Sequence, residues 1–251
     1  MRRIKISAIS YLNTAPFVYG LRHSEIYKHV DVVYDSPAKC AARLLSRDAD
    51  LGIVPAVIIP QIPEYKIVSN YCIGADGPVR SVAICSSTPL EKIERLYLDG
   101  ESRTSILLAR LLLNEYKGLF PKTITELQEK EIDPSDSGAA YVLIGDKVFR
   151  HEADFPYIYD LAQMWKEFRN LPFVFAAWTA VNPLSDDFCE AFNLALSDGI
   201  GKIPEAVAEY KPQIGEQEAV KYLTENIKYE LDEPKHKALI EFWSMASRYR
   251  S

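Results

Sequence analysis

Two segments of this chain each join a short apolar strand pattern to the start of a helix through a turn rich in hydroxyl groups. In the longer example, residues 95–98 have a strand pattern and residues 106–113 form a strongly apolar helical run. Between them lie the turn residues Ser102, Arg103, Thr104 and Ser105. The first turn of a helix has backbone N–H groups without intrahelical partners and a partial positive charge, which attracts carboxylates and phosphates. The segment therefore predicts an anion-binding helix start.

The beginning of the chain repeats this construction. Residues 4–9 have a strand pattern, and Tyr11, Asn13, Thr14 and Pro16 lead into an expected helix. Two helix starts of this kind favour a ligand that carries two anionic groups.

Strand-like and helix-like segments alternate through the first 180 residues, which is typical of an α/β protein with a mostly parallel sheet. Further strands are expected at 30–34, 51–54, 65–68, 81–85, 139–144 and 173–178. Helices are expected at 36–46 and 159–168, a helix start at 87–90, and a polar surface segment at 122–137. From residue 185 onward the pattern is helical to the end, with breaks at Pro204, Pro212 and Pro234.

Two strand-like segments, near 81–87 and 173–181, divide this pattern into two lobes. We expect lobe 1 to comprise residues 1–83 and 176–251, and lobe 2 to comprise residues 84–175, because the C-terminal helices must pack on an existing sheet. Two strand crossings make a hinge and an inter-lobe cleft, which is a common location for ligands.

Composition excludes several classes of protein. The 251 residues carry a formal net charge of −6, which argues against general binding to nucleic acid or acidic membranes. The apolar runs are shorter than the roughly 20 residues that span a bilayer, and the opening residues lack a signal-peptide pattern, so a cytoplasmic location is expected. The four cysteines and four histidines are scattered without the spacing of metal ligands, so no metal site is expected.

Several short strings occur in order and together resemble the chorismate dehydratase family of the futalosine route to menaquinone. The strings are Ile-Ser-Tyr-Leu-Asn-Thr-Ala-Pro-Phe at 9–17, Gly-Pro-Val-Arg-Ser-Val at 77–82, Ser-Arg-Thr-Ser at 102–105, Leu-Ile-Gly-Asp at 143–146 and Leu-Pro-Phe-Val-Phe-Ala at 171–176. Two positions differ from the expected pattern, because Phe168 and Asn170 stand where Trp and Gly are expected.

The resemblance implies a periplasmic-binding-protein-like fold, a two-lobed flytrap of the second structural type with a two-strand hinge. It implies a hydro-lyase that converts chorismate to 3-[(1-carboxyvinyl)oxy]benzoate and water, without a cofactor or metal. Chorismate has a ring carboxylate and an enolpyruvyl carboxylate, which agrees with two anion-binding helix starts. Beyond chorismate, the resemblance implies one further partner, a transient contact with the next enzyme of the pathway.

With this resemblance, Asn13 and Ser81 are the expected catalytic residues, because both can hydrogen-bond the departing hydroxyl or a carboxylate. The expected substrate-binding residues are Tyr11, Thr14, Pro55, Ser102, Arg103, Thr104, Ser105, Gly145, Asp146 and Phe175. Structural readings stay open: Asn13 and the hydroxyl residues can be ordinary helix caps, and Phe173 and Phe175 can be core residues.

The motif segments contain no His or Glu in the position of a general base. We therefore hypothesise that the enolpyruvyl carboxylate of chorismate removes the ring proton while Asn13 and Ser81 hold it in place.

Two other functions remain open. One is a non-catalytic binding protein for a small carboxylate, because the fold alone does not give chemistry. The other is the related 1,4-dihydroxy-6-naphthoate synthase, which is expected to use a His in the cleft, and none of the four histidines lies in a matching motif. The effector domain of a transcription regulator is disfavoured by the acidic charge and by the lack of a helix-turn-helix pattern.

Overall fold

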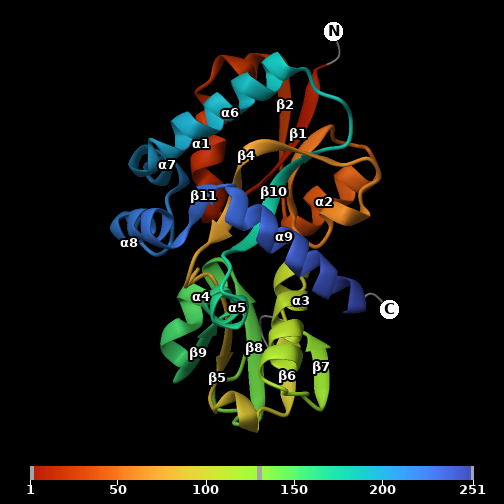
Figure 1. Ribbon diagram of the computed structural model, residues 1–251. Helices are drawn as coiled ribbons and strands as arrows, with labels where there is room; N and C mark the ends of the chain where they lie inside the picture. The colour runs from red at the N-terminus through yellow and green to blue at the C-terminus, as the bar shows by residue number, and fades with distance from the viewer. Residues whose placement is uncertain (1–2, 129–131, 250–251) are drawn as a thin grey trace.

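The computed structural model describes residues 3–128 and 132–249, which form two lobes, each built on one β-sheet (Figure 1). The sheet of lobe 1 has the order β11-β4-β10-β3-β1-β2. Its strands are β1 (Ile4–Ile9), β2 (Val30–Asp35), β3 (Leu51–Pro55), β4 (Lys66–Ala75), β10 (Phe173–Ala180) and β11 (Lys228–Glu230). The sheet of lobe 2 has the order β7-β6-β8-β5-β9. Its strands are β5 (Val82–Ser86), β6 (Arg95–Leu98), β7 (Thr123–Glu126), β8 (Ala139–Ile144) and β9 (Tyr157–Asp160).

The strands of the second sheet all come from the stretch between β4 and β10, so the chain leaves the first sheet once and returns once. This membership supports the expected division into 1–83 plus 176–251 and 84–175, which stays a prediction at the level of its boundaries.

Both sheets are mixed. Most strands of each sheet run in one direction, as expected, and the exceptions are β10 and β11 in lobe 1 and β5 in lobe 2. In lobe 1, β1 pairs parallel with β2 and β3, whereas β10 pairs antiparallel with β3 and β4, and β11 pairs antiparallel with β4. In lobe 2, β6 is parallel to β7 and β8, and β5 is antiparallel to β8 and β9. The alternation of strands and helices does not encode the direction of a strand such as β10, which enters its sheet from the other lobe.

Helices pack around both sheets (Figure 1). They are α1 (Ala15–Arg22), α2 (Pro37–Leu45), α3 (Arg103–Leu111), α4 (Asp146–His151), α5 (Leu161–Arg169), α6 (Asp186–Ile200), α7 (Ile203–Tyr210), α8 (Glu216–Lys221) and α9 (Glu233–Ala246). Helix α9 crosses the waist of the molecule and contacts both β10 and α3. Within residues 3–128 and 132–249, none of the helices has the length and apolar character needed to span a bilayer.

Helix α1 is held in place by a close crossing with α6. A Cβ atom on Gly20 would lie 1.9 Å from the carbonyl oxygen of Ala195, and one on Gly199 would lie 1.9 Å from that of Pro16. Only glycine permits this approach at both positions. The crossing fixes the start of α1 and, with it, the turn that carries Tyr11 and Asn13.

Several predicted elements differ from the structure at their ends or in their type. The stretch at 159–160 belongs to β9 instead of the helix, which begins at Leu161, and the C-terminal region contains β11 besides its helices. The helix start expected at 87–90 is a single 3-10 turn, Leu90–Lys92. The segment at 122–137 contains β7, and its residues 129–131 lie outside the described part of the chain. Each missed strand is short and lies at a sheet edge, where pairing with a neighbour and not the local pattern defines it.

The two crossings between the lobes contain backbone conformations that most residues avoid. Gly77 and Arg80 have φ values of 112° and 65° in the connection between β4 and β5, and Asn170 has a φ of 53° in the connection between α5 and β10. Asn170 ends α5 in the left-handed conformation, which Gly and Asn tolerate best. This explains why Asn can replace the glycine expected at this position.

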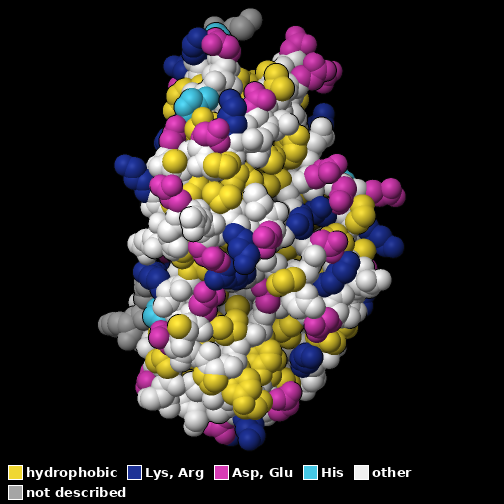
Figure 2. Space-filling view, turned by 90° about the vertical axis from the view of Figure 1, so that its left-hand side faces the viewer, with side chains coloured by type: hydrophobic (Ala, Val, Ile, Leu, Met, Phe, Trp, Pro, Cys, Tyr) yellow, Lys and Arg dark blue, Asp and Glu magenta, His cyan; other side chains and the backbone are white. Residues whose placement is uncertain are grey.

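One face of the molecule carries charges of both signs, interspersed with apolar side chains (Figure 2). The apolar side chains gather most densely at its lower end, in the region of lobe 2. Among the exposed apolar side chains of lobe 2 are Tyr157 and Ile158 of the edge strand β9. This face presents no broad basic surface of the kind that nucleic acids bind.

Candidate active site between the lobes

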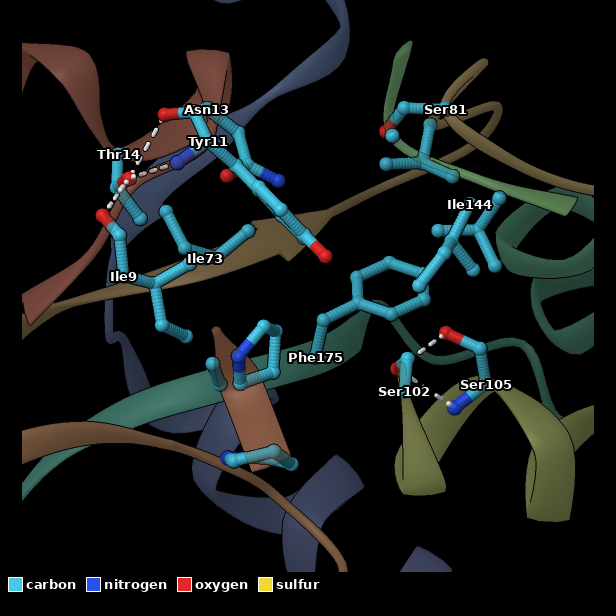
Figure 3. A pocket seen from close by; sticks show the side chains of 16 residues that line it. Ile9, Tyr11, Asn13, Thr14, Ile73, Ser81, Ser102, Ser105, Ile144 and Phe175 are labelled. Carbon is cyan, nitrogen blue, oxygen red and sulfur yellow. Dashed lines mark hydrogen bonds between the residues drawn. The ribbon is translucent and has the colours of Figure 1, made fainter. Parts of the chain in front are cut away.

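A small cavity of about 60 Å³ lies between the two lobes, at the point where both crossings pass (Figure 3). It is lined by Ile9, Tyr11, Asn13, Thr14, Pro37, Pro55, Ile73, Val79, Ser81, Val82, Ser102, Ser105, Ile144, Gly145, Phe175 and Ala176. Its walls come from the turn before α1, from the ends of β3 and β8, from both crossings, and from the start of α3. We call this space the inter-lobe cavity.

The structure brings most of the predicted site residues together around the inter-lobe cavity. Those that line it are Tyr11, Asn13, Thr14, Pro55, Ser81, Ser102, Ser105, Gly145 and Phe175. Arg103, Thr104 and Asp146 do not line it. Figure 3 shows the ring of Phe175 between the turn that carries Tyr11 and Asn13 and the start of α3 with Ser102 and Ser105.

The turn before α1 is a 3-10 turn, Leu12–Thr14, whose geometry depends on one side chain. Thr14 Oγ1 lies 2.6 Å from the Ile9 carbonyl oxygen and 3.3 Å from the Tyr11 backbone nitrogen, which donates to it. The Thr14 hydroxyl therefore shapes the turn, and its own proton is used by the backbone. Asn13, between these capping contacts, keeps its side chain for other partners.

Helix α3 begins within the predicted segment. Ser102 is its N-cap, which is the structural alternative that the sequence left open for this residue. Ser102 Oγ accepts a hydrogen bond from the Ser105 backbone nitrogen at 3.3 Å and lies 2.9 Å from Ser105 Oγ. Thr104 is buried, and its Oγ1 accepts a hydrogen bond from the Val57 backbone nitrogen in lobe 1 at 3.3 Å. Thr104 thus joins the lobes, while the side chain of Arg103 is exposed and outside the cavity.

Gly145 connects β8 to α4 beside the first crossing. Its φ of 58° and ψ of −138° form a conformation available in practice to glycine alone, and its backbone nitrogen donates to the Ser81 carbonyl oxygen at 2.8 Å. The next residue, Asp146, is half-buried, and burial raises the pKa of its carboxyl group, while Arg150 opposes this shift. Gly145 therefore has a structural reason to be glycine and holds the backbone of Ser81.

Arg80, the residue before Ser81 in the hinge, forms hydrogen bonds and ion pairs with both lobes. The Arg80 backbone nitrogen donates to an Asp160 carboxylate oxygen at 2.5 Å, and Asp160 also caps α5. The Arg80 guanidinium group pairs with Glu152 in lobe 2 at 2.9 Å and with Glu218 in lobe 1. These contacts fix the strained backbone of Arg80, and so the position of Ser81.

The lining of the inter-lobe cavity is neutral, because each of its described side chains is apolar, a hydroxyl or an amide. One group of charges lies beyond the hydroxyl of Tyr11, which donates to Glu101 across the lobes. Lys147 lies 2.8 Å from Asp99 and 3.7 Å from Glu101. Burial and the Glu101 carboxylate raise the pKa of Tyr11, so its hydroxyl remains a proton donor. An anion in this cavity would be held by backbone and side-chain dipoles and not by a direct ion pair.

Two tyrosines near the C-terminus contact the predicted catalytic residues, although no sequence motif pointed to them. The Tyr222 hydroxyl is 2.7 Å from Ser81 Oγ, and the Tyr229 hydroxyl donates to the Asn13 carbonyl oxygen at 3.0 Å. Each is a lone tyrosine in a helical or strand-like pattern, more than 140 residues from its partner. Only the tertiary structure brings them to the site.

Phe173 and Phe175 have different roles on β10. Phe173 packs edge-on against Trp165 and Phe242, with ring centroids 5.4 and 5.0 Å away, inside the core. Phe175 lines the inter-lobe cavity. The interpretation of Phe173 as a core residue is therefore confirmed.

Among the residues that the structure describes, no group of three or more His, Cys, Asp or Glu side chains is placed to hold a metal ion.

The two lobes, the double crossing and the cavity between them define a protein of the periplasmic-binding-protein fold. A solved structure from Archaeoglobus fulgidus has a TM-score of 0.78 with 16% sequence identity, over 98% of this chain and 97% of that one. A Candida albicans gene product, described as having the generic periplasmic binding protein fold, has a TM-score of 0.64 with 13% identity over 100% and 92% of the two chains. These likenesses establish the fold.

By sequence, the chain belongs to the family described as menaquinone biosynthesis, whose profile matches residues 4–248. It is also similar to a chorismate dehydratase from Thermus thermophilus, with 26% identity over 263 aligned positions that cover 96% of this chain and 94% of that protein.

Proposed function

We propose that this protein is a chorismate dehydratase, a hydro-lyase that forms 3-[(1-carboxyvinyl)oxy]benzoate in the futalosine route to menaquinone. The observation that carries the proposal is the convergence of Asn13, Ser81 and the start of α3 on one inter-lobe cavity in a member of the menaquinone biosynthesis family. The similarity to the Thermus thermophilus chorismate dehydratase supports the same reaction.

The arrangement of donors fits a substrate with two carboxylates. The 3-10 turn with Asn13 faces the cavity from one side, and the capped start of α3 faces it from the other. A helix start stabilises a nearby anion by about 0.3–2 kcal/mol, and the hydroxyl and amide donors add hydrogen bonds to a charged acceptor. One carboxylate at each side would orient the ring between them, against Phe175.

The reaction requires a ring C–H bond to break, its electron pair to form the new ring double bond, and the neighbouring hydroxyl to leave. The hydroxyl takes up a proton and departs as water, so no electrons are gained or lost overall. The neutral lining supports the enolpyruvyl carboxylate of the substrate as the proton acceptor, held by Asn13 and Ser81. A well-positioned intramolecular base can lower a barrier by roughly 7–11 kcal/mol in favourable cases.

The volume of the cavity implies motion of the lobes. Sites for small molecules measure about 300–1,000 Å³, well above the space found here. A substrate of this size therefore enters only when the lobes part, and their return would exclude water from the bound molecule. In this proposal the protein works with chorismate alone, in the cytoplasm, without a metal, cofactor, membrane or nucleic acid. A transient contact with the next pathway enzyme remains a prediction.

A direct assay tests the proposed function. Purified protein is incubated with chorismate, and the aromatic product is followed by absorbance and identified by mass, with a loss of one water. Turnover that disappears when the protein is omitted supports the proposal. Binding of chorismate without turnover would favour a carboxylate-binding protein instead, and turnover only of the cyclic precursor of a dihydroxynaphthoate would favour the naphthoate synthase.

A second assay tests the identity of the base. A chorismate analogue without the enolpyruvyl carboxylate should bind more weakly and fail to lose water at a measurable rate. If the chemical step with this analogue is as fast as with chorismate, a protein group must accept the proton.

A further inference from the structure

Tyr222 occupies a junction between both lobes and the hinge, although it does not line the inter-lobe cavity. It is the first residue of a π-helical turn, Tyr222–Asn226, and its side chain is fully buried. Its ring packs edge-on against Phe149 of α4 in lobe 2, with centroids 5.2 Å apart. π-helical turns are rare and occur frequently at functional sites. A buried polar hydroxyl such as that of Tyr222 also needs hydrogen-bond partners, and those partners show what it can do.

The hydroxyl of Tyr222 hydrogen-bonds one of the two predicted catalytic side chains. It donates to Ser81 Oγ at 2.7 Å, and both residues are buried. The other predicted residue, Asn13, is held through its backbone by a second buried tyrosine, because the Tyr229 hydroxyl donates to the Asn13 carbonyl oxygen at 3.0 Å.

The direction of the hydrogen bond from Tyr222 determines what Ser81 can do. A serine hydroxyl has one proton, and when its oxygen accepts a hydrogen bond from Tyr222, that proton is left for another acceptor. Ser81 lines the inter-lobe cavity, so its proton is available to a molecule bound there. A hydroxyl that already accepts a hydrogen bond is also a stronger donor, because hydrogen bonds in series polarise one another.

We propose that Tyr222 is a positioning residue that presents the Ser81 proton to a carboxylate or departing hydroxyl in the cavity. The inference deepens the proposed function and rests on it for its kinetic consequence. Burial keeps the pKa of Tyr222 above its ordinary value, so the phenol keeps its proton near neutral pH and can donate it to Ser81 Oγ.

The kinetic test is a double-mutant cycle with Tyr222→Phe and Ser81→Ala. Tyr222→Phe should lower kcat on the order of tenfold with KM nearly unchanged, which corresponds to one hydrogen bond. In the Ser81→Ala background the same substitution should change kcat less than twofold, because Tyr222 acts through Ser81. The matched control is Tyr141→Phe, which removes another buried tyrosine hydroxyl, one that hydrogen-bonds the Asp133 backbone in lobe 2 away from the cavity.

Tyr141→Phe should lose a similar amount of thermal stability but keep its kcat. Equal, multiplicative losses of kcat from Tyr222→Phe in both backgrounds would overturn the inference, and so would a loss of kcat in Tyr141→Phe that matches that of Tyr222→Phe.

A structural readout separates this inference from the proposed function. Crystal structures of the unmodified protein and of Tyr222→Phe are compared at the Ser81 side chain. A changed Ser81 rotamer supports positioning by Tyr222, and an unchanged rotamer overturns it. If the unmodified protein fails to dehydrate chorismate, the proposed function is refuted, and this comparison still decides whether Tyr222 positions Ser81.

Discussion

Asn13 is the residue for which a catalytic role and a structural role make the most different predictions. Its side chain does not cap α1, whose turn is shaped by Thr14. Asn13→Ala should therefore lower kcat by about 10²–10³-fold, as expected when a donor to developing charge is removed, while stability falls by only about 1 kcal/mol. Turnover of chorismate and thermal unfolding measure the two effects. Parallel losses in both would make Asn13 a structural residue of the turn.

Asp146 provides a prediction about pH. Because burial raises the pKa of its carboxyl group, the folded protein holds this proton more tightly than the unfolded chain does. The stability from this group is then fully present below the unfolded pKa and is lost as the pH rises through the folded pKa. The stability difference between Asp146→Asn and the unmodified protein should thus become more favourable to the variant from pH 3 to pH 7. Thermal unfolding at both pH values measures it, and a change in favour of the unmodified protein over this range would mean that Arg150 outweighs burial.

Single residues could be predicted from sequence where their role is local. Ser102 as the N-cap of α3, and Gly145 at its turn, follow from the chemistry of caps and turns within a few residues. Arg103 was expected at the anion, but its position on the first turn of the helix places its side chain at the surface. Tyr222 could not be predicted, because its partners are set by the packing of α8 and α4 against the hinge.

At the scale of elements, the start of α3 is where capping and ligand binding can be separated. Ser102→Ala removes the cap and should cost about 1 kcal/mol of stability. Ser102→Asp keeps a capping oxygen and the favourable charge at the helix start, so it should fold as stably as the parent. The added carboxylate would face the substrate anion in the cavity, and KM for chorismate should rise at least tenfold. An unchanged KM in Ser102→Asp would show that no anion binds at this helix start.

The sequence predicted long and strongly patterned elements better than short ones. Helix α2 extends over nearly all of its expected range because Ser36 caps it and Pro37 begins it, and β8 matches its apolar run. Strand β11 consists of three residues that add to the edge of β4, and β9 is an exposed edge strand beside β5. Their pairing is a property of the neighbouring strand, so no period in their own residues could predict it.

At the scale of the whole molecule, the contacts that join the lobes are numerous and individually weak. They include the Tyr11–Glu101 hydrogen bond in the cleft and, outside the cavity, the ion pairs Arg169–Glu241 and Arg248–Glu115. Ion pairs at partly exposed positions contribute about 0–1 kcal/mol each. A set of such contacts can hold the lobes together around a ligand and still separate when the ligand leaves.

Solution scattering tests whether this separation accompanies substrate binding. Without ligand, the lobes should sample more open arrangements than the structure described above, and chorismate should reduce the radius of gyration by bridging the turn before α1 and the start of α3. Glu101→Gln weakens the contact of Tyr11 with lobe 2, because the amide carries no charge, so this variant should be more expanded without chorismate. With saturating chorismate it should reach the same compact profile as the parent, because the substrate makes the main contacts across the cleft. Identical profiles with and without chorismate, in both proteins, would contradict a closing flytrap and require the substrate to enter by a local opening of the cavity wall.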